Sequence, residues 1–318
     1  MDKISLVIPC YNEEESLPYL EKELNNLIEK MDVSFEIIMI DNASEDNTLK
    51  KIKELNKKYK NIKYISFSRN FGKEASMYAG LKASTGDYVA IMDADLQDPP
   101  ELLIDMYKMI KEKNIDCVAT YQKNRKDNFF IRKIFASIFY KIMKKISKLE
   151  IKNGARDYRL MTRQMVDAIL SLNEVERFSK GIFSWVGFKT EWISFEGKKR
   201  VAGKTKLPIK SATHYAINGI TSFSNAPLVF SAIIGFTLCI ASIIYIIVVI
   251  INNIINGDKI MPGYSSLMCV ILFGFGLTLF VLGIIGKYIS TIYLEIKKRP
   301  LYIIKEKSEN INEKSDLY

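Results

Sequence analysis

The stretch that decides the fold covers residues 88–100 and reads YVAIMDADLQDPP. Its opening residues, 88–92, are apolar and include β-branched and aromatic side chains, which is typical of a short buried strand. The carboxylates Asp93 and Asp95 follow at once, and two prolines end the segment. Because ligands of open α/β sheets bind beyond the carboxyl ends of the strands, this segment predicts such a sheet with a site at its edge.

Four other short, mostly apolar runs have the character of strands. They cover residues 4–8, 35–40, 62–67 and 115–119. Between them, leucine and isoleucine recur at spacings of three and four, which predicts amphipathic helices. Strands alternating with helices predict an α/β fold with a mostly parallel, Rossmann-like sheet covered on both faces.

Polar residues follow four of these predicted strands. They occupy residues 9–13, 41–44, 68–70 and 93–95. The carboxyl ends of parallel strands meet at one edge of a sheet, so we expect the four segments to converge there. The sequence therefore predicts one binding site built from four separate parts of the chain.

Asp93 and Asp95 are the predicted metal ligands, and Gln97 adds a neutral oxygen. Carboxylate, amide and substrate phosphate oxygens are the donors that Mg²⁺ and Mn²⁺ prefer. An ion held there offsets the charge of a leaving diphosphate. Two aspartates in this spacing are common by themselves, so the prediction depends on their position at a strand end.

The segments that follow the first two predicted strands each support two interpretations. Ser44, with Asn47 or Thr48 in the next turn, has the chemistry of a helix N-cap, whereas Asp41 is placed to accept hydrogen bonds from a base or a ribose. Both can hold together, with Ser44 capping and Asp41 binding. Residues 9–13, PCYNE, suit either a contact with a nucleobase or a plain strand-to-helix turn.

The net charge of +10 favours an anionic partner. Residues 125–152 carry nine basic side chains against two acidic ones, with aliphatic and aromatic residues at helical spacing. This pattern predicts a basic amphipathic helix on a membrane surface. The alternative is an ordinary helix with a solvated basic face. We favour the membrane because apolar segments follow, and we predict no nucleic-acid partner.

Two apolar segments, about 228–251 and 267–289, are long enough to span a membrane; the first carries no charge, and the second has Lys287 near its end. The first would extend about 36 Å as a helix, against a hydrocarbon core of roughly 30 Å. Basic residues flank both segments, so the positive-inside rule predicts a multi-pass protein of the cell membrane with both termini in the cytoplasm. No export signal is evident, because Met1 leads almost directly into the first strand.

The predicted organisation has three parts. A cytoplasmic domain covers residues 1–214, a membrane domain 215–289, and a polar cytoplasmic tail 290–318. We expect residues 305–318 to be disordered because they are mostly polar. The four cysteines show no paired spacing, which argues against a disulfide framework or a zinc site.

Three segments together resemble family 2 glycosyltransferases of the GT-A fold. They are VIPCYNEE at 7–14, DNASED at 41–46 and DADLQDPP at 93–100. The extension at 96–100 is similar to the polyprenyl-phosphate branch, which includes dolichol-phosphate mannosyltransferases and bacterial undecaprenyl-phosphate glucosyltransferases. Residues 200–206, RVAGKTK, resemble a basic segment of that branch. Asn42 departs from the family, which often has a second aspartate there.

The resemblance implies a role for each matching residue. Contacts with the nucleotide would come from Pro9, Cys10, Tyr11, Glu13, Asp41, Lys73, Asp93 and Ala94. Metal and diphosphate contacts would come from Asp93, Asp95 and Gln97. Phosphate groups of the donor or the lipid would face Arg125, Arg200 and Lys206. Arginine grips phosphate with two hydrogen bonds and lysine acts as a point charge. For Arg200 and Lys206 the alternative is a positive flank of the first membrane span.

Asp157 matches the position proposed as the base in that branch. A base must reach the proton of the acceptor. A lipid monophosphate is already mostly ionised near neutral pH, its second pKa being around 6. We therefore expect Asp157 to orient the acceptor or to neutralise a nearby cation. A role as general base is the bolder hypothesis. A structural pair with Arg156 or Arg159 is the alternative.

The implied reaction is inverting transfer of a sugar from a UDP-, GDP- or dTDP-linked donor to a polyprenyl phosphate at the cytoplasmic face of the membrane, with Mg²⁺ or Mn²⁺. One alternative is another lipid or polysaccharide acceptor, and a second is a non-catalytic, membrane-tethered nucleotide-binding module. A dehydrogenase is disfavoured because no G-x-G-x-x-G follows the first strand. Glycines in the second span fit close packing between helices, so the sequence is compatible with both a monomer and a homo-oligomer.

Overall fold

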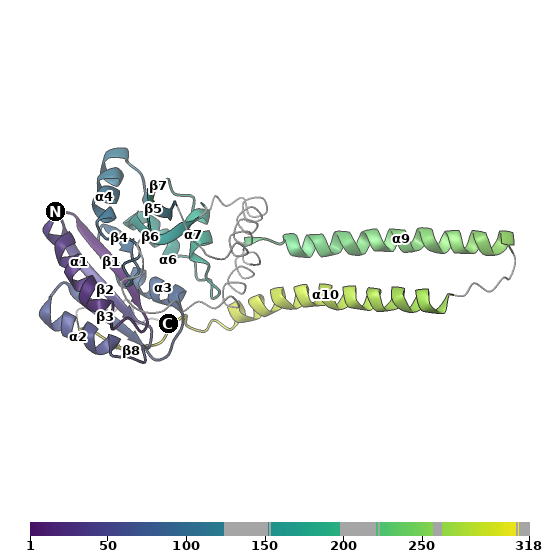
Figure 1. The fold of residues 1–318 in the computed structure, drawn as a ribbon, viewed down its shortest axis with the longest axis horizontal. Helices are drawn as coiled ribbons and strands as arrows, with labels where there is room; N and C mark the ends of the chain where they lie inside the picture. The colour runs from purple at the N-terminus through teal and green to yellow at the C-terminus, as the bar shows by residue number, and fades with distance from the viewer. Residues whose placement is uncertain are drawn as a thin grey trace. The chain divides into compact units, whose positions relative to one another are not determined.

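The computed structural model describes residues 1–123, 152, 154–197, 221, 223–256, 263–309 and 311 (Figure 1). The chain divides into two compact units, residues 1–219 with 299–318, and residues 220–298. The basic helix predicted at 125–152 lies outside the described residues apart from Lys152, and so do Arg125, Arg200 and Lys206. Those predictions stay predictions.

The first unit is built on an eight-stranded sheet in the order β7-β5-β6-β4-β1-β2-β3-β8. Its strands are β1 (Lys3–Cys10), β2 (Ser34–Asp41), β3 (Ile62–Phe67), β4 (Tyr88–Ile91), β5 (Cys117–Gln122), β6 (Ala155–Thr162), β7 (Thr190–Phe195) and β8 (Ile304–Lys307). The pairings of β6 and β8 are antiparallel, and the other pairings between the described strands are parallel. The predicted α/β fold with a mostly parallel sheet is confirmed.

Helices cover both faces of this sheet. They are α1 (Leu17–Glu29), α2 (Thr48–Lys58), α3 (Lys73–Ala83), α4 (Leu102–Lys113), α6 (Arg163–Leu170) and α7 (Ser179–Trp185). Alternate residues of β2 show the two faces: Ile37 and Met39 pack with α1, α2 and α4, whereas Ile38 and Ile40 pack against α3. Successive side chains of a strand point to opposite faces, so this near-continuous apolar strand is buried on both sides.

A buried charge lies on β2 near its amino end. Glu36 is 2% exposed, with Lys63 Nζ 2.7 Å from its Oε1 and Ser5 Oγ donating to its Oε2. Burial alone would raise the pKa of Glu36, but the hydrogen bonds from Lys63 and Ser5 lower it to about 2. This network ties β1, β2 and β3 together at the edge opposite the predicted site.

The segment after the second apolar helix corrects one prediction. Residues 305–318 are expected to be disordered, but strand β8 pairs antiparallel with β3. The ring of Tyr302 stacks on Phe67 with centroids 5.0 Å apart, and Ile311 is buried against α3. The prediction is wrong for this part of the tail, because an edge strand needs only a few apolar anchors, which a polar average composition hides.

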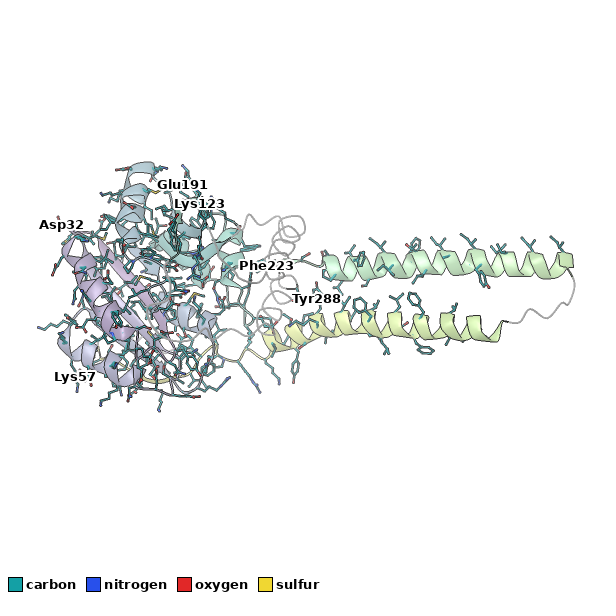
Figure 2. The ribbon with its side chains drawn as sticks, viewed as in Figure 1. Asp32, Lys57, Lys123, Glu191, Phe223 and Tyr288 are labelled. Atoms are coloured by element: carbon teal, nitrogen blue, oxygen red, sulfur yellow. The ribbon has the colours of Figure 1, made fainter. Side chains whose placement is uncertain are left out.

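The second unit contains two long helices, α9 (Ala226–Asn256) and α10 (Tyr264–Ile296). Each is long and apolar enough to cross a membrane. Their large apolar side chains are exposed, Phe236 by 69% and Phe275 by 68%, and Figure 2 shows such side chains projecting outward along both helices. Two long apolar helices after the sheet domain are therefore confirmed as part of the fold.

Candidate active site

The polar segments that follow β1, β2 and β3 contact one another at the carboxyl edge of the sheet. The first two meet where Asn12 N donates to Ser44 Oγ at 3.0 Å. The second and third meet where Asn42 Nδ2 donates to Asn70 Oδ1 at 2.9 Å. Because β1, β2 and β3 are neighbours in the sheet, parallel strands bring segments far apart in sequence into contact.

Ser44 has a different role from the predicted helix cap. Helix α2 begins at Thr48, its N-cap is Asn47, and Ser44 instead accepts the hydrogen bond from Asn12. Asp46 Oδ1 accepts from Thr48 N at 2.9 Å and satisfies that end of the helix. The prediction is wrong because the chain turns at Ala43, where φ is 55°, and this turn moves Ser44 away from the helix.

Asp41 and Asn42 occupy the end of β2. Asp41 is 1% exposed and accepts hydrogen bonds from Ser66 Oγ at 2.8 Å and from Ser44 N at 3.2 Å. Asn42 donates to Asn70 Oδ1, an oxygen that also accepts from Gly72 N, so the residue at position 42 must be a donor. An aspartate could not make that bond when ionised, which gives a physical reason for the departure from the family pattern.

The residues that follow β1 form the turn into α1. Cys10 is buried, and its carbonyl oxygen accepts from Asn42 N at 2.9 Å. Glu13 Oε2 accepts from Ser16 Oγ at 2.7 Å, and Glu13 N donates to Thr48 Oγ1 at 2.7 Å. The thiol of Cys10 donates to Ile8 O at 3.5 Å, so the side chains of Cys10 and Glu13 both have structural partners, and Tyr11 is half-buried beside them. Their predicted contacts with a nucleotide stay predictions.

The segment after β4 joins the site through Lys73, the first residue of α3. Lys73 Nζ lies 2.6 Å from Asp93 Oδ1 and 2.6 Å from Asp157 Oδ2. The two carboxylates are 23% and 16% exposed, so both are largely withdrawn from solvent. One ammonium group therefore connects the predicted metal ligand Asp93 with the predicted catalytic residue Asp157.

Asp95, Ala94 and Gln97 lie in the turn beyond Asp93. Asp95 is 6% exposed, and its Oδ1 accepts from Gln97 N at 3.1 Å. Leu96, between them, has a φ of 55°, a left-handed conformation that closes the turn. Ala94 is 2% exposed and lets the backbone pass close to the sheet.

Strand β6 explains how Asp157 reaches this edge. It runs antiparallel beside β4, with Ile91 opposite Arg159, so its first residues lie next to the carboxyl end of β4. Arg156 Nε contacts Asp98 Oδ1 at 2.8 Å, and Tyr158 Oη donates to Pro100 O at 2.9 Å. Three consecutive residues of β6 thus contact the 93–100 loop directly or through Lys73.

The charges in this cluster shift several pKa values. Burial opposes the charge of Asp157, but Lys73 and Lys180 outweigh it and hold the pKa of Asp157 well below its usual range. Burial likewise opposes the charge of Lys73, and Asp157 and Asp93 hold its pKa above its usual range. Burial raises the pKa of Asp98 to about 6, against the attraction of Arg156. At neutral pH, Lys73 and Asp157 are an ion pair.

The structural alternative for Asp157 was a pair with Arg156 or Arg159, and the partner is Lys73 instead. Arg156 is engaged by Asp98. Arg159 donates to the backbone oxygen of Asp157 at 3.2 Å, and its guanidinium lies 3.6 Å from the centre of the Phe183 ring.

The donor set at the end of β4 fits a divalent cation that substrate oxygens complete. Among the described residues, no group of three or more histidine, cysteine, aspartate or glutamate side chains gathers as a metal site. Asp93, Asp95 and Gln97 supply two carboxylates and an amide. Magnesium in proteins is commonly held by one or two carboxylates together with substrate phosphates, so this set matches that chemistry.

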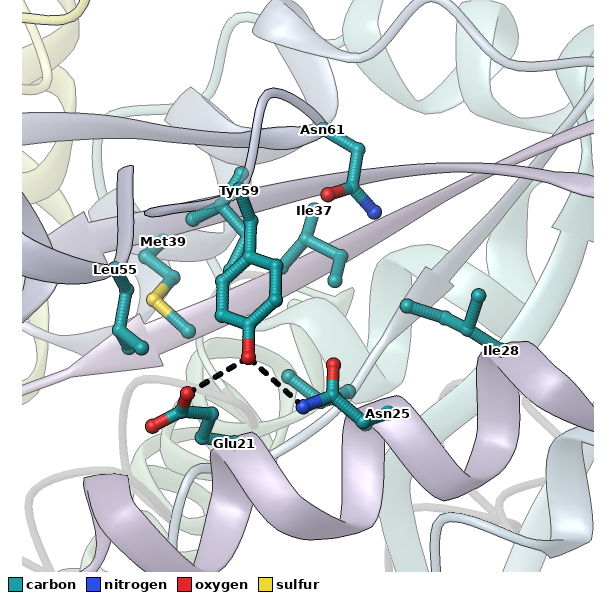
Figure 3. Close-up of a pocket in the computed structure, with 10 residues that line it drawn as sticks. Glu21, Asn25, Ile28, Ile37, Met39, Leu55, Tyr59 and Asn61 are labelled. Carbon is teal, nitrogen blue, oxygen red and sulfur yellow. Dashed lines mark hydrogen bonds between the residues drawn. The ribbon is translucent and has the colours of Figure 1, made fainter. Parts of the chain in front are cut away.

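Two cavities lie elsewhere in the first unit. One, shown in Figure 3, lies between α1 and the sheet, and Tyr59 Oη there donates to Glu21 Oε1 at 2.8 Å and accepts from Asn25 Nδ2 at 3.0 Å. Its volume of about 10 Å³ leaves room for no more than about one water molecule. The other, of about 330 Å³, is open and lies beside Tyr88 and Thr162 at the opposite end of β4. Neither is lined by a residue predicted for the site.

Four residues of this edge were not assigned a role in the site from the sequence. They are Asn70, Asp98, Arg156 and Tyr158, of which Arg156 was named only as an alternative partner of Asp157. Asp98 stands inside the quoted DADLQDPP segment, and Arg156 and Tyr158 flank Asp157, so their neighbourhood was the available signal. Which carboxylate each arginine faces depends on the register of β6 against β4, which sequence spacing does not give.

Comparisons with known proteins agree on one family. Residues 5–170 match the model described as "Glycosyl transferase family 2". The chain is 40% identical over 303 residues to "Putative glycosyltransferase CsbB" of Bacillus subtilis (strain 168), covering 95% of this chain and 91% of that protein. It is 38% identical to "Prophage bactoprenol glucosyl transferase homolog" of Escherichia coli (strain K12), covering 95% of this chain and 98% of that protein.

One solved structure is similar to part of the chain. The crystal structure of mannosyl-3-phosphoglycerate synthase from Rubrobacter xylanophilus aligns with a TM-score of 0.48 and 15% identity, over 68% of this chain and 71% of that one. "Bactoprenol glucosyl transferase" of Shigella phage SfII is 38% identical over 304 residues, covering 96% of this chain and 98% of that protein.

Proposed function

The chain belongs to glycosyl transferase family 2, and we propose that it transfers a sugar from a nucleotide-sugar donor to a polyprenyl phosphate. The proposal is supported by relatives named bactoprenol glucosyl transferase, whose similarity covers nearly the whole chain, the two long apolar helices included. The observation that carries it is the ion-pair cluster in which Lys73 joins Asp93 to Asp157. In this proposal Lys73 lies between the diphosphate side of the site, at Asp93, and the acceptor side, at Asp157.

The donor side is proposed to lie along the carboxyl ends of β1, β2 and β4. Pro9, Cys10 and Tyr11 would border the base, and Asp41 would accept hydrogen bonds from the base or the ribose. An ionised carboxylate has about four acceptor positions, so the bonds from Ser66 and Ser44 leave capacity for a ligand. Glu13 and Ala94 would contribute through the shape of their turns.

Asp93, Asp95 and Gln97 are proposed to hold Mg²⁺ or Mn²⁺ together with the diphosphate of the donor. When bound, the ion offsets negative charge as the diphosphate leaves. Arg125, Arg200 and Lys206 are proposed to face phosphate groups of the donor or the acceptor, and their placement lies outside the described residues.

The proposed reaction is a single displacement at the anomeric carbon of the sugar. An oxygen of the lipid phosphate attacks the anomeric carbon and forms a new C–O bond. The bond from that carbon to the nucleoside diphosphate breaks, and the diphosphate leaves with the electron pair. Attack from the side opposite to the leaving group inverts the configuration at the carbon. The positive charge of Lys73 stabilises negative charge that develops on the departing oxygens.

Asp157 is proposed to orient the acceptor rather than to act as a strong base. The pKa of its carboxyl is held well below the usual range, chiefly by Lys73 against the effect of burial, which makes it a weak proton acceptor. A lipid phosphate is already mostly ionised near neutral pH and needs no deprotonation. Asp157 instead keeps Lys73 between the two substrates.

The helices α9 and α10 are proposed to cross the cell membrane as a hairpin, with the catalytic unit and both chain ends in the cytoplasm. Basic residues precede the first helix and follow the second, as the positive-inside rule requires for this orientation. A polyprenyl phosphate carries its charged group at the membrane surface. The hairpin would therefore keep the catalytic unit close to its acceptor.

A direct assay tests the proposal. Purified full-length protein is mixed with undecaprenyl phosphate and, in turn, UDP-, GDP- and dTDP-linked sugars, with Mn²⁺, with Mg²⁺ or with a chelator. We expect one donor class to give a glycosylated lipid phosphate, only with metal, and Asp95→Asn to lose at least about a hundred-fold in rate. Lys111→Met, on the opposite edge beside Asp2, is the matched control. Transfer that survives both the chelator and Asp95→Asn would contradict the metal role, and no transfer with any donor would contradict the function.

A further inference from the structure

The ammonium group of Lys73 contacts a carboxylate oxygen of Asp93, one of the predicted metal ligands. Its Nζ lies 2.6 Å from Asp93 Oδ1 and 2.6 Å from Asp157 Oδ2, with its side chain 41% exposed. A divalent cation of this class binds carboxylate oxygens at about 2.0–2.1 Å. A metal on Asp93 and the ammonium of Lys73 would thus stand within a few ångströms of each other, and like charges at that distance repel.

The position of Lys73 in its helix makes this contact an exchangeable one. Lys73 is the first residue of α3, and Gly72 before it has a φ of 93°. A positive charge is unfavourable at a helix N-terminus, so Lys73 is held there by the two carboxylates and not by its helix. Its flexible four-carbon stem lets the charged group move without moving the backbone.

We propose that Lys73 is the exchangeable counter-ion of this site: it neutralises Asp93 in the metal-free protein and passes to the diphosphate of the donor when a divalent cation takes Asp93. The proposal rests on the proposed function only in that the site accepts a metal and a nucleoside diphosphate. It gives Lys73 two successive partners, a carboxylate and then a phosphate, at one end of α3.

Exchange of this kind couples the binding of the metal ion to the binding of the nucleoside diphosphate. Without a nucleotide, a metal ion must displace Lys73 from Asp93 and leave it without that anionic partner. With a nucleoside diphosphate present, the displaced ammonium gains phosphate oxygens in place of the carboxylate. Each ligand therefore raises the affinity for the other, and the coupling passes through Lys73.

Removing the charge at position 73 then has two effects of opposite sign. The metal-free protein loses the competitor for Asp93, so the metal binds more tightly. The nucleotide loses its cation, so it no longer improves metal binding to the same extent. A residue that only supported the local fold would weaken metal binding in both conditions.

The test measures Mn²⁺ affinity of the full-length protein in detergent by electron paramagnetic resonance, alone and with saturating UDP, GDP or dTDP. For the natural protein we expect at least about a ten-fold gain in affinity with one of the nucleotides. Without nucleotide, we expect Lys73→Met to bind Mn²⁺ at least about three-fold more tightly than the natural protein does. With nucleotide, we expect the Mn²⁺ affinity of Lys73→Met to rise by less than about three-fold. Lys73→Gln repeats the measurement with a polar chain, and Lys73→Arg keeps the charge and should keep the natural behaviour.

Lys111→Met removes the same charge from the ion pair with Asp2, 3.0 Å away, and should change neither affinity. The proposal is overturned if both Lys73→Met and Lys73→Gln bind Mn²⁺ no more tightly than the natural protein without nucleotide, or if they keep its full gain. It is also overturned if the natural protein shows no gain with any of the three nucleotides. This binding test contains no acceptor lipid, so its result does not depend on whether the protein transfers a sugar. A negative result in the binding test likewise leaves sugar transfer to be judged by its own assay.

Discussion

Replacing Arg156 with glutamine removes the cation that faces the buried carboxyl of Asp98. Arg156 Nε lies 2.8 Å from Asp98 Oδ1, and the side chain of Asp98 is 1% exposed. Removal of one partner from a buried ion pair usually costs about 3–5 kcal/mol, because an uncompensated charge is left behind. The structure indicates a smaller value, because this carboxyl is already close to taking up a proton.

The magnitude follows from the pKa of Asp98, which burial raises to about 6. At pH 7 the protonated form of the folded protein therefore lies about 1.4 kcal/mol above the ionised form. In Arg156→Gln the carboxyl becomes protonated, so the loss in unfolding free energy is this difference plus about 1 kcal/mol for the hydrogen bond. We expect roughly 2–3 kcal/mol at pH 7.5.

The sign with pH is fixed by the direction of the shift. A carboxyl whose folded pKa is raised makes its most favourable contribution below its unfolded pKa and loses it as the pH rises to the folded pKa. At pH 5 both proteins hold Asp98 neutral when folded, so the difference should shrink to about 1 kcal/mol. Above pH 6 it should grow to its full value.

Chemical denaturation followed by tryptophan fluorescence measures this difference, because the two tryptophans, Trp185 and Trp192, both lie in the sheet unit. Asp98→Asn leaves no titrating group in the pair, so the cost of adding Arg156→Gln to Asp98→Asn should be the same at pH 5 and at pH 7.5. An equal cost of Arg156→Gln at both pH values in the natural background, or an undiminished pH dependence of that cost in the Asp98→Asn background, would refute the reasoning.

Two further changes test other parts of the fold. Glu36→Gln should lower the unfolding free energy by about 3 kcal/mol at pH 7, because the pKa of Glu36 is lowered to about 2 from an ordinary 4.5. The difference in unfolding free energy from the natural protein should become smaller as the pH falls from about 4.5 towards 2. An unchanged difference at pH 3 would contradict the buried-charge network. Ile311→Ala should lower the unfolding free energy by about 2–4 kcal/mol and speed amide hydrogen exchange in β8. Lys305→Ala, whose side chain is exposed, should do neither. Equal exchange rates in both variants would contradict a packed tail.

The strands could be predicted because their apolar patterns are local. The run at 88–92 followed by Asp93 predicts a strand end, and parallel strands then require such ends to meet. Contacts between distant residues were less accessible. Lys73 and Asp157 are 84 positions apart, and their ion pair depends on β6 lying antiparallel beside β4, a pairing that no local pattern specifies.

Two errors have separate physical causes. Ser44 has the chemistry of a helix cap, but a left-handed turn occurs at Ala43 and the helix begins only at Thr48. The hydroxyl oxygen of Ser44 instead accepts a hydrogen bond from Asn12 N. Strand β8 was missed because its sequence is short and polar, and its stability comes from Tyr302 and Ile311 on either side of it. In both cases tertiary contacts decide the outcome over local preference.

The configuration of the sugar in the lipid product tests the central claim most directly. In the proposed reaction the leaving diphosphate lies on the Asp93 side of the sugar and the lipid phosphate on the Asp157 side, so the attack is in line. Nuclear magnetic resonance of the glycosylated undecaprenyl phosphate should show an anomeric configuration opposite to that of the nucleotide sugar. A product with the donor's configuration retained would contradict the account.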